Sequence, residues 1–202
     1  MSSSSAAPTS TASTTLATES LQDFCTVLAS KQPTPGGGAS AAVCAAVGAS
    51  TAAMSASYTQ RKKDEESGAA DLARKLISDM DITALLAMAD DDVNAYKALQ
   101  STWKKDHGLS KERIDGINTT ALKVPTVLVE ACYDRVLYIQ KFLPSCNPNI
   151  TSDARVGIHQ LAGSARAAYQ TVLVNNPPDE EKQRLRAMLK ELQDIENELL
   201  GL

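Results

Sequence analysis

The hydrophobic residues of this chain recur every three or four positions, and that spacing predicts α-helices rather than strands. A first helix over about residues 19–31 is marked by four apolar positions, Leu21, Phe24, Cys25 and Leu28. Residues 39–59 form a second helix-compatible stretch, made almost entirely of Ala, Ser, Val, Gly and Thr. A helix with so few bulky side chains lets partner helices come close to its axis.

A third helix begins near Gly68, after a charged run, and its apolar positions extend to Trp103. Leu109 and Ser110 then have the pattern of a hydrophobic staple and an N-cap for a fourth helix. The apolar face of that helix consists of Ile114, Ile117, Ala121, Val124, Leu128 and Ala131. Pro125 lies inside this run, so we expect the helix to kink or split there.

Pro and Asn dominate residues 144–151, and this composition predicts a loop. Ser152 is the expected N-cap of the next helix, with Asp153 in its first turn. That helix should last to about Asn175, because Pro177-Pro178 follow and cannot continue it.

The last predicted helix begins at residues 179–181, where three acidic side chains favour a helix start. It carries a heptad-like apolar stripe formed by Leu185, Met188, Leu192, Ile195 and Leu199. Such a stripe between charged flanks is typical of a surface-docked helix or of a subunit contact. Taken together, the helical segments predict an all-α, up-and-down helical bundle.

The composition of the chain narrows its class. Its 202 residues carry a net charge of −4 and no basic stripe, which argues against nucleic-acid binding. Ser, Thr and Ala dominate residues 1–18, which we expect to be a disordered tail before one helical domain at 19–202. The tail lacks the apolar core of a signal peptide, so a cytoplasmic protein is expected. Residues 39–59 are too poor in Leu to favour a membrane span over a buried helix.

The cysteines and histidines have no metal-site spacing. The four cysteines, Cys25, Cys44, Cys132 and Cys146, are widely spaced and include no CxxC pair. Cys25 and Cys44 lie on apolar helical patterns, which predict buried thiols. The two histidines, His107 and His159, are far apart and have no zinc-ligand pattern around them. We therefore expect no metal.

The junction Pro33-Thr34-Pro35-Gly36-Gly37-Gly38 leads directly into the small-residue helix. Its prolines favour an extended approach, and its glycines permit a tight turn with positive φ that can approach a ligand closely. The helix N-terminus also presents free N–H groups to an anion or a polar ring edge. Two interpretations stay open, a turn into a packing helix or a ligand-cradling loop. The glycine spacing matches neither a P-loop nor a dinucleotide fingerprint.

The run Asp90-Asp91-Asp92 lies inside the third predicted helix, where helical phase separates its side chains. Asp92 interrupts an apolar stripe of Leu85, Met88, Tyr96 and Leu99, whereas Asp90 lies about 200° around the helix. A carboxylate on an apolar face must be paired, hydrogen-bonded or protonated. Desolvation raises the pKa of such a group toward the range useful for acid–base catalysis. The alternative is a structural Asp at the rim of the core, paired with an Arg.

Two polar clusters are further candidates. The run Arg61-Lys62-Lys63 is either a solvated turn or a site for a polyanionic tail such as glutamate carboxylates. A second group consists of Asn147, Asn149, Ser152 and Asp153. It suits helix capping or a set of donors and acceptors for a heterocycle, and Asn175 near a helix end is open to the same two interpretations.

Five motifs occur in one order along about residues 20–200 and carry a family resemblance. They are Pro-Thr-Pro-Gly-Gly-Gly-Ala-Ser-Ala-Ala (33–42), Ala-Asp-Asp-Asp-Val-Asn-Ala-Tyr (89–96), Lys-Val-Pro (123–125), Asn-Pro-Asn-Ile-Thr-Ser-Asp (147–153) and Val-Leu-Val-Asn (172–175). The pattern resembles the cyclodeaminase domain of formiminotransferase-cyclodeaminase. It is equally similar to the stand-alone bacterial methenyltetrahydrofolate cyclohydrolases built on the same domain.

The resemblance implies an all-helical subunit that forms a homodimer, with a folate site near the glycine turn and the central helices. It marks Asp92 and Asp153 as candidate catalytic residues, and the phase of the helix independently selects Asp92. The positions that match the substrate pocket of the family are Gly36, Gly37, Gly38, Ser40, Lys62, Lys63, Asn147, Ser152 and Asn175. The implied substrate is a tetrahydrofolate derivative, with no tightly bound cofactor.

Two reactions are implied by the resemblance. In a cyclodeaminase, N10 of 5-formimino-tetrahydrofolate attacks the amidine carbon and ammonia leaves, giving 5,10-methenyltetrahydrofolate. In a cyclohydrolase, water attacks the methenyl carbon and 10-formyltetrahydrofolate results. We expect the first, with Asp92 balancing the cationic amidine and moving the proton. Cys146 and Thr171 depart from the Gly and Asn that the family often has, which leaves a non-catalytic folate-binding helical dimer as a third alternative.

Overall fold

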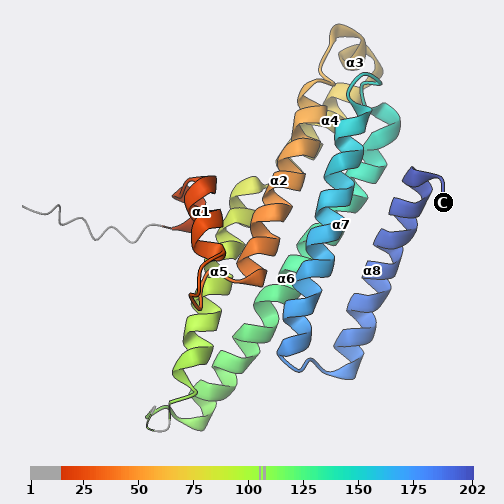
Figure 1. The fold of residues 1–202 in the computed structure, drawn as a ribbon. Coiled ribbons are helices and arrows are strands. Elements are labelled where there is room, and N and C mark those ends of the chain that lie inside the picture. Colours follow the sequence, from red (N-terminus) through yellow and green to blue (C-terminus); the bar gives the residue numbers. More distant parts are fainter. Residues whose placement is uncertain (1–14, 105, 107) are drawn as a thin grey trace, which may run out of the picture.

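The computed structural model describes residues 15–202 except 105 and 107, and all regular elements in this part of the chain are helices. In chain order they are η1 (Leu16–Thr18), α1 (Leu21–Leu28), α2 (Gly37–Ser57), α3 (Lys62–Ser67), α4 (Ala69–Met80), α5 (Ile82–Ser101), α6 (Lys111–Phe142), η2 (Leu143–Ser145), α7 (Thr151–Val174) and α8 (Asp179–Leu200). The long helices run up and down alongside one another (Figure 1). The predicted all-α bundle is confirmed.

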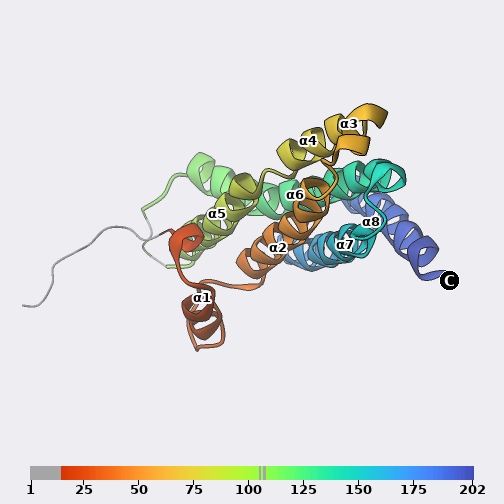
Figure 2. The same cartoon turned by 90° about the horizontal axis from the view of Figure 1, so that it is seen from above.

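Helix α2 forms the centre of the bundle. It packs most extensively against α7, and then against α5 and α4. Figure 1 shows α2 and α7 side by side, and the start of α7 lies at the same end as the last turn of α2. From above, α4, α5 and α6 lie on one side of α2, and α1 extends from the other side (Figure 2). The opposite side of α2 is therefore left without a neighbouring long helix.

Small residues allow α2 and α7 to approach closely. A Cβ atom added at Gly157 would lie 2.9 Å from the Ala52 Cβ and 2.9 Å from the Gly48 carbonyl oxygen. A Cβ added at Gly48 would lie 2.9 Å from the Gln160 Cβ. Real Cβ atoms do not approach neighbours this closely, so both glycines are required by space rather than by backbone conformation.

The third predicted helix is two helices, because the chain breaks at Asp81. This residue adopts a left-handed conformation (φ 32°, ψ 67°), and its side chain accepts a hydrogen bond from the Ala84 N–H. The buried Arg135 side chain of α6 donates to the Met80 carbonyl at the end of α4 at 2.8 Å. A side-chain cap on one helix and a tertiary donor on the other replace the hydrogen bonds lost at the break.

Helix α6 does not split at Pro125, which is buried within its 32 residues. Packing of α6 against α7 and α5 outweighs the loss of one backbone donor. Helix α7 begins at Thr151 with Ile150 as its N-cap, so the prediction of Ser152 as N-cap is wrong by two residues. The run Arg61-Lys62-Lys63 is more than a solvated turn, because residues Lys62–Ser67 form the short helix α3, which begins with a capping box at Arg61.

The N-terminal region differs from its prediction at two points. Residues Leu16–Thr18 form a 3-10 helix, although 1–18 were expected to be disordered; residues 1–14 lie outside the described residues. Cys25 and Cys44 are exposed rather than buried, whereas Cys132 and Cys146 are buried. Apolar periodicity could not place Cys44, because nearly every residue of α2 is small or apolar.

The remaining helices close the bundle. Helix α8 buries Leu185, Leu192 and Ile195 against α7 and α6, as expected of a surface-docked helix. Among the described residues, α2 alone is long and apolar enough to cross a membrane by length and composition, and 61% of its most apolar window is buried inside the bundle.

Candidate functional site

Asp92 of α5 lies against the N-terminus of α2. Its Oδ2 accepts a hydrogen bond from the Ala39 N–H at 2.9 Å, in the first turn of α2. The N-cap of α2 is Gly36, which has no side chain to satisfy this donor. The carboxylate of a distant helix therefore serves as the cap, and the partial positive charge of the helix end favours its anionic form.

Gly38 makes room for the Asp92 carboxylate. A Cβ atom at this position would lie 2.0 Å from Asp92 Oδ1 and 2.5 Å from its Cγ. No such conflict exists at Gly36 or Gly37, where an added Cβ meets nothing within 4 Å. The expected positive-φ turn is wrong, because none of the three glycines has a positive φ. The junction therefore requires a residue without a side chain at one position only, Gly38.

The burial of Asp92 perturbs its acidity. Desolvation raises the pKa of the carboxyl group above its ordinary value, and the hydrogen bond from Ala39 opposes this rise without cancelling it. Oδ1 accepts no hydrogen bond from the described residues, so one oxygen remains for an external proton or cation. A half-buried carboxyl group with a raised pKa is a better proton donor and acceptor for acid–base chemistry than an ordinary surface Asp.

Asp90 has a different partner, as its helical phase predicts. Its Oδ1 accepts a hydrogen bond from the Leu16 N–H at 2.8 Å, which ties η1 to α5. Within the described part of the chain, no Arg is paired with Asp92 or Asp90. Two residues on one helix therefore hold two separate backbone segments, one before α1 and one after it.

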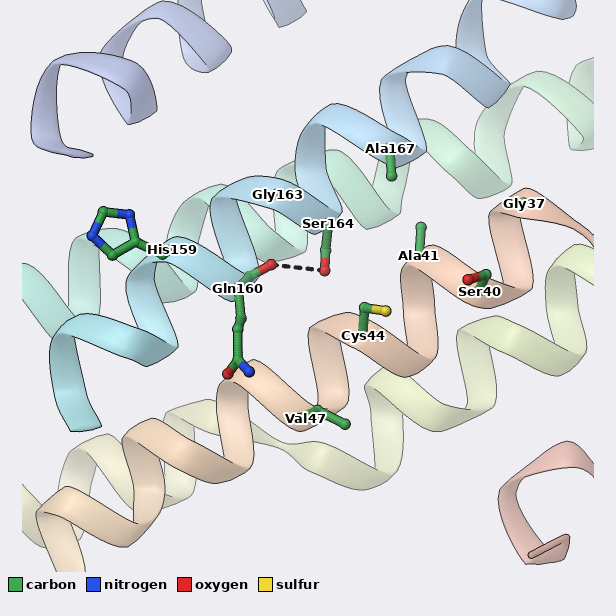
Figure 3. Close-up of a pocket in the computed structure, with 10 residues that line it drawn as sticks. All are labelled: Gly37, Ser40, Ala41, Cys44, Val47, His159, Gln160, Gly163, Ser164 and Ala167. Atoms are coloured by element: carbon green, nitrogen blue, oxygen red, sulfur yellow. Dashed lines mark hydrogen bonds between the residues drawn. The ribbon is translucent and has the colours of Figure 1, made fainter. Parts of the chain in front are cut away.

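A groove between α2 and α7 begins at the same end of α2. It encloses about 380 Å³, and Figure 3 shows that its lining comes only from these two helices. From α2 it is lined by Gly37, Ser40, Ala41, Cys44 and Val47, and from α7 by His159, Gln160, Gly163, Ser164 and Ala167. Ser40, predicted as a substrate residue, thus faces a shallow, mostly apolar groove beside the glycine junction.

Gln160 is an unusual member of this groove. Its Oε1 atom is buried and has no hydrogen-bond partner among the described residues. The Ser164 hydroxyl donates to the backbone carbonyl of Gln160 instead, at 2.9 Å (Figure 3). A buried acceptor without a donor is costly, which distinguishes this amide from the other side chains of the groove.

A second polar group lies at the opposite end of α2 and contains Asn147. Its Oδ1 accepts from Arg61 Nη1 at 2.7 Å, its Nδ2 donates to the Tyr58 carbonyl at 3.0 Å, and its N–H donates to the Thr59 hydroxyl at 3.0 Å. Asn147 is 6% exposed. These bonds fasten the loop before α7 to the C-terminus of α2, so Asn147 shapes this end of the molecule.

Arg61 is held in place by Asp64. Its Nε and Nη2 donate to the two carboxylate oxygens at 2.6 and 2.8 Å. The hydrogen bond from the Arg61 side chain lowers the pKa of Asp64 to about 2. The paired, forked geometry is the strong form of such an ion pair.

The other predicted residues at this end are accessible. Lys62 and Lys63 project from α3 into solvent, and Lys62 approaches Glu66 at 4.0 Å. Ser152 donates to Asp153 Oδ2 at 3.2 Å in the first turn of α7. Lys62 and Lys63 are available to an external carboxylate, but Asp64, Glu65 and Glu66 follow them, so residues 61–66 carry no net charge.

His159 and Asn175 make local contacts. His159 Nδ1 lies 3.0 Å from Glu196 Oε1, and Arg166 pairs with the same carboxylate. Burial raises the pKa of Glu196, but the bonds from Arg166 and His159 outweigh it and hold the pKa below its ordinary value. Asn175 Nδ2 donates to the Thr171 carbonyl at 2.9 Å. The described part of the chain has no cluster of three metal-ligating side chains.

Comparison with known proteins shows the family of the chain. The family model described as formiminotransferase-cyclodeaminase matches residues 20–194. The chain belongs to this family. It is 29% identical over 184 residues to the methenyltetrahydrofolate cyclohydrolase of Methylorubrum extorquens, covering 88% of each chain. Its fold is similar to the crystal structure of formiminotetrahydrofolate cyclodeaminase from Thermotoga maritima, with a TM-score of 0.75, 24% identity and coverage of 88% and 89% of the two chains.

The residues predicted for the catalytic and substrate sites fall into two groups. Gly36–Gly38, Ser40 and Asp92 lie at the N-terminus of α2, and Lys62, Lys63, Asn147, Ser152 and Asp153 lie beyond its C-terminus, with Asn175 at the first end. Helix α2 has 21 residues, so the groups are about 30 Å apart. One copy therefore does not bring Asp92 and Asp153 together.

Sequence reasoning missed Gln160 and Arg61. A signal for the first existed in the heptad spacing of α7, where Val156, Gln160, Gly163, Ala167 and Val174 share a face. Arg61 was noted only as part of a basic run. Its pairing with Asn147 joins positions 86 residues apart, and no local pattern reports such a contact.

Proposed function

We propose that this chain, a member of a family of folate one-carbon enzymes, is a formimidoyltetrahydrofolate cyclodeaminase. The observation that carries the proposal is the Asp92 carboxyl group, half-buried at a helix N-terminus, with a raised pKa and one oxygen that accepts no hydrogen bond from the described residues. The reaction needs one group that stabilises a cationic amidine and also carries a proton, and such a carboxyl group can do both.

In the proposed reaction, N10 of 5-formimino-tetrahydrofolate attacks the carbon of the protonated amidine and forms the N10–C bond. Asp92 takes the proton that N10 loses and gives it to the exocyclic nitrogen. The bond from carbon to that nitrogen then breaks, and ammonia leaves. The positive charge stays on the N5–C–N10 unit of 5,10-methenyltetrahydrofolate, so the proton and charge balance closes within one pocket.

Methenyltetrahydrofolate cyclohydrolase activity is the second candidate, and the relative from Methylorubrum extorquens favours it. In that reaction Asp92 would take a proton from the attacking water. Oδ1, which accepts no bond from the described residues, is the atom suited to either role. The two activities differ in the leaving group and not in the demand on the carboxyl group.

We further propose that a homodimer completes the site. The uncovered face of α2 carries a stripe at alternating steps of four and three, formed by Ser40, Cys44, Val47, Thr51, Met54 and Tyr58. Val47, Met54 and Tyr58 are 46%, 39% and 61% exposed, which is high for apolar side chains. A helix face of this kind is suited to a partner helix.

Two-fold symmetry gives this face a specific consequence. If α2 packs antiparallel on the partner's α2, the N-terminus of each helix lies beside the C-terminus of the other. Asp92 and Gly38 of one copy then lie next to the partner's Lys63 and Asp153. A folate pterin at Asp92 with its glutamate tail toward the lysines fits this composite site.

Absorbance at the methenyltetrahydrofolate band tests the reaction, with the formimino and methenyl compounds supplied separately. A rising signal with release of ammonia supports the cyclodeaminase, and an accelerated decay of the methenyl compound supports the cyclohydrolase. Traces that match the blanks for both compounds would refute an enzyme and leave the non-catalytic folate-binding dimer.

Mixing two inactive variants tests the shared site. Asp92→Asn and Asp153→Asn remove groups that, in the proposed dimer, serve the same site from different copies. After unfolding and joint refolding, half of the dimers would be mixed, and each would have one intact site of two. Activity should return to about a quarter of the wild-type value. Absence of recovery, with mixed dimers shown by differential tagging, would refute the composite site.

A further inference from the structure

Residues 19–35 form an excursion that leaves the bundle and returns to almost the same place. Before it, the Leu16 N–H is bonded to Asp90; after it, the Ala39 N–H is bonded to Asp92. Both acceptors lie on α5, two residues apart. The excursion contains α1 and is therefore attached at both ends beside the candidate catalytic carboxylate.

Helix α1 makes little contact with the rest of its own chain. None of the substantial helix–helix contacts involves α1, and Phe24 is its only buried residue. Phe24 is not part of the main hydrophobic core. Leu21 is 65% exposed and Cys25 is exposed, although both lie on the apolar face of this amphipathic helix. An eight-residue helix in water is not stable without packing, so this face calls for a partner.

The direction of α1 indicates which partner. In Figure 2, α1 extends beyond α2 on the side away from α4 and α6. That is the side on which the exposed stripe of α2 lies, because the other faces of α2 contact α7, α5 and α4. An apolar helix that projects past an apolar interface is placed to reach across it.

The charges near α1 complement the far end of α2. Asp23 is exposed in the first turn of α1, and the half-buried Glu19 lies just before the helix. Beyond the C-terminus of α2, Lys62 and Lys63 are exposed on α3, and Arg155 is exposed in the first turns of α7. In the antiparallel dimer these opposite charges lie at the same end, which favours that pairing over a parallel one.

We propose that α1 is an exchanged arm that packs on the far end of the partner's α2, with Leu21 near the partner's Tyr58, and so covers the composite folate site. The inference rests on the dimer proposed above. Since both ends of the arm are bonded to α5 at Asp90 and Asp92, its docking on the partner fixes the position of the glycine junction at that site.

Photo-crosslinking tests the arm in the full-length chain. p-Benzoyl-phenylalanine replaces Leu21, or Cys25 in a second variant, and the matched control carries it at Tyr138 of α6, which is 42% exposed. The oligomeric state is measured first by sedimentation. After irradiation, covalent dimers are separated under denaturing conditions, and the crosslinked peptides are identified by mass spectrometry.

The expected result is a covalent dimer with crosslinks from position 21 or 25 to residues 54–63, and no such product from the Tyr138 control. Within one chain these positions lie at opposite ends of the 21-residue α2, so the crosslink must join two copies. A protein that sediments as a dimer but gives only crosslinks within one chain would overturn the arm and leave the dimer intact. Sedimentation as a monomer would overturn both.

Discussion

Replacing Gly38 with Ala tests the link between the glycine junction and the candidate catalytic carboxylate of Asp92. The new Cβ would lie 2.0 Å from Asp92 Oδ1, while ordinary contacts begin near 3.4 Å, so the carboxylate must move by more than 1 Å. It would then lose the hydrogen bond from the Ala39 N–H. Because the Asp92 carboxylate lies at the end of a short, rotatable side chain, it can move aside, and we expect the variant to keep its fold.

The expected magnitude follows from two opposing effects. Losing a hydrogen bond to a charged group costs about 1.5–3 kcal/mol. Replacing Gly by Ala within a helix stabilises the folded state by about 0.5–1 kcal/mol. A net loss of about 1.5 kcal/mol should lower the melting temperature by about 3–6 °C in a domain of this size. Displacing the proton-carrying group by about 1 Å should reduce turnover about 100-fold.

Gly116→Ala is the matched control, because an added Cβ at this α6 position meets nothing within 4 Å. It should raise the melting temperature slightly and leave turnover unchanged. Thermal unfolding and the methenyltetrahydrofolate absorbance assay are measured on both variants. Gly38→Ala is then repeated in an Asp92→Ala background, where the conflict is absent. An equal stability loss in both backgrounds would show that contact with Asp92 is not the reason for Gly38.

Three further changes probe the charges of the bundle. Because the pKa of Asp92 is raised in the folded state, its contribution to stability is full at low pH and is lost as the pH rises. The melting temperature of Asp92→Asn, relative to that of the wild type, should therefore increase between pH 4 and pH 7. A constant difference between the two melting temperatures would contradict the raised pKa. Asp64 has a pKa of about 2, so its pairing with Arg61 should stabilise the fold above pH 4 and lose this effect toward pH 2. At the low end of this range, the wild type and Asp64→Asn should have the same melting temperature. Arg135→Met leaves the Met80 carbonyl without its donor and should lower the free energy of unfolding by about 1–3 kcal/mol in denaturant titrations, whereas Arg135→Lys should lose less.

The helices themselves could be predicted because their signals are local. Apolar spacing, the Ser110 cap and the prolines at 177–178 located most of the long elements, since each acts within a few residues of its own position. The break at Asp81 and the passage of α6 through Pro125 could not be predicted in this way. Both depend on contacts with other helices, such as the bond from Arg135 to the Met80 carbonyl.

For the candidate site, too, local signals could be predicted and tertiary contacts could not. Helical phase alone separated Asp92 from Asp90, and the structure gives these two carboxylates different partners, the Ala39 and Leu16 N–H groups. The phase argument could not supply the reason for Gly38, which is the space for a side chain 54 residues away. Nor could it show that Cys44 faces outward, because a helix of small residues has no contrast between its faces.

The sequence by itself determined the helical class and the family, and it singled out Asp92 as a candidate, because periodicity, ordered motifs and phase are properties of the chain alone. Only the tertiary structure decided how these residues are grouped. It placed Asp92 at one end of α2 and Asp153 at the other, about 30 Å apart along 21 residues. The physical reason is that a long, straight helix separates whatever its two ends carry, and the order of motifs along a chain does not contain that distance.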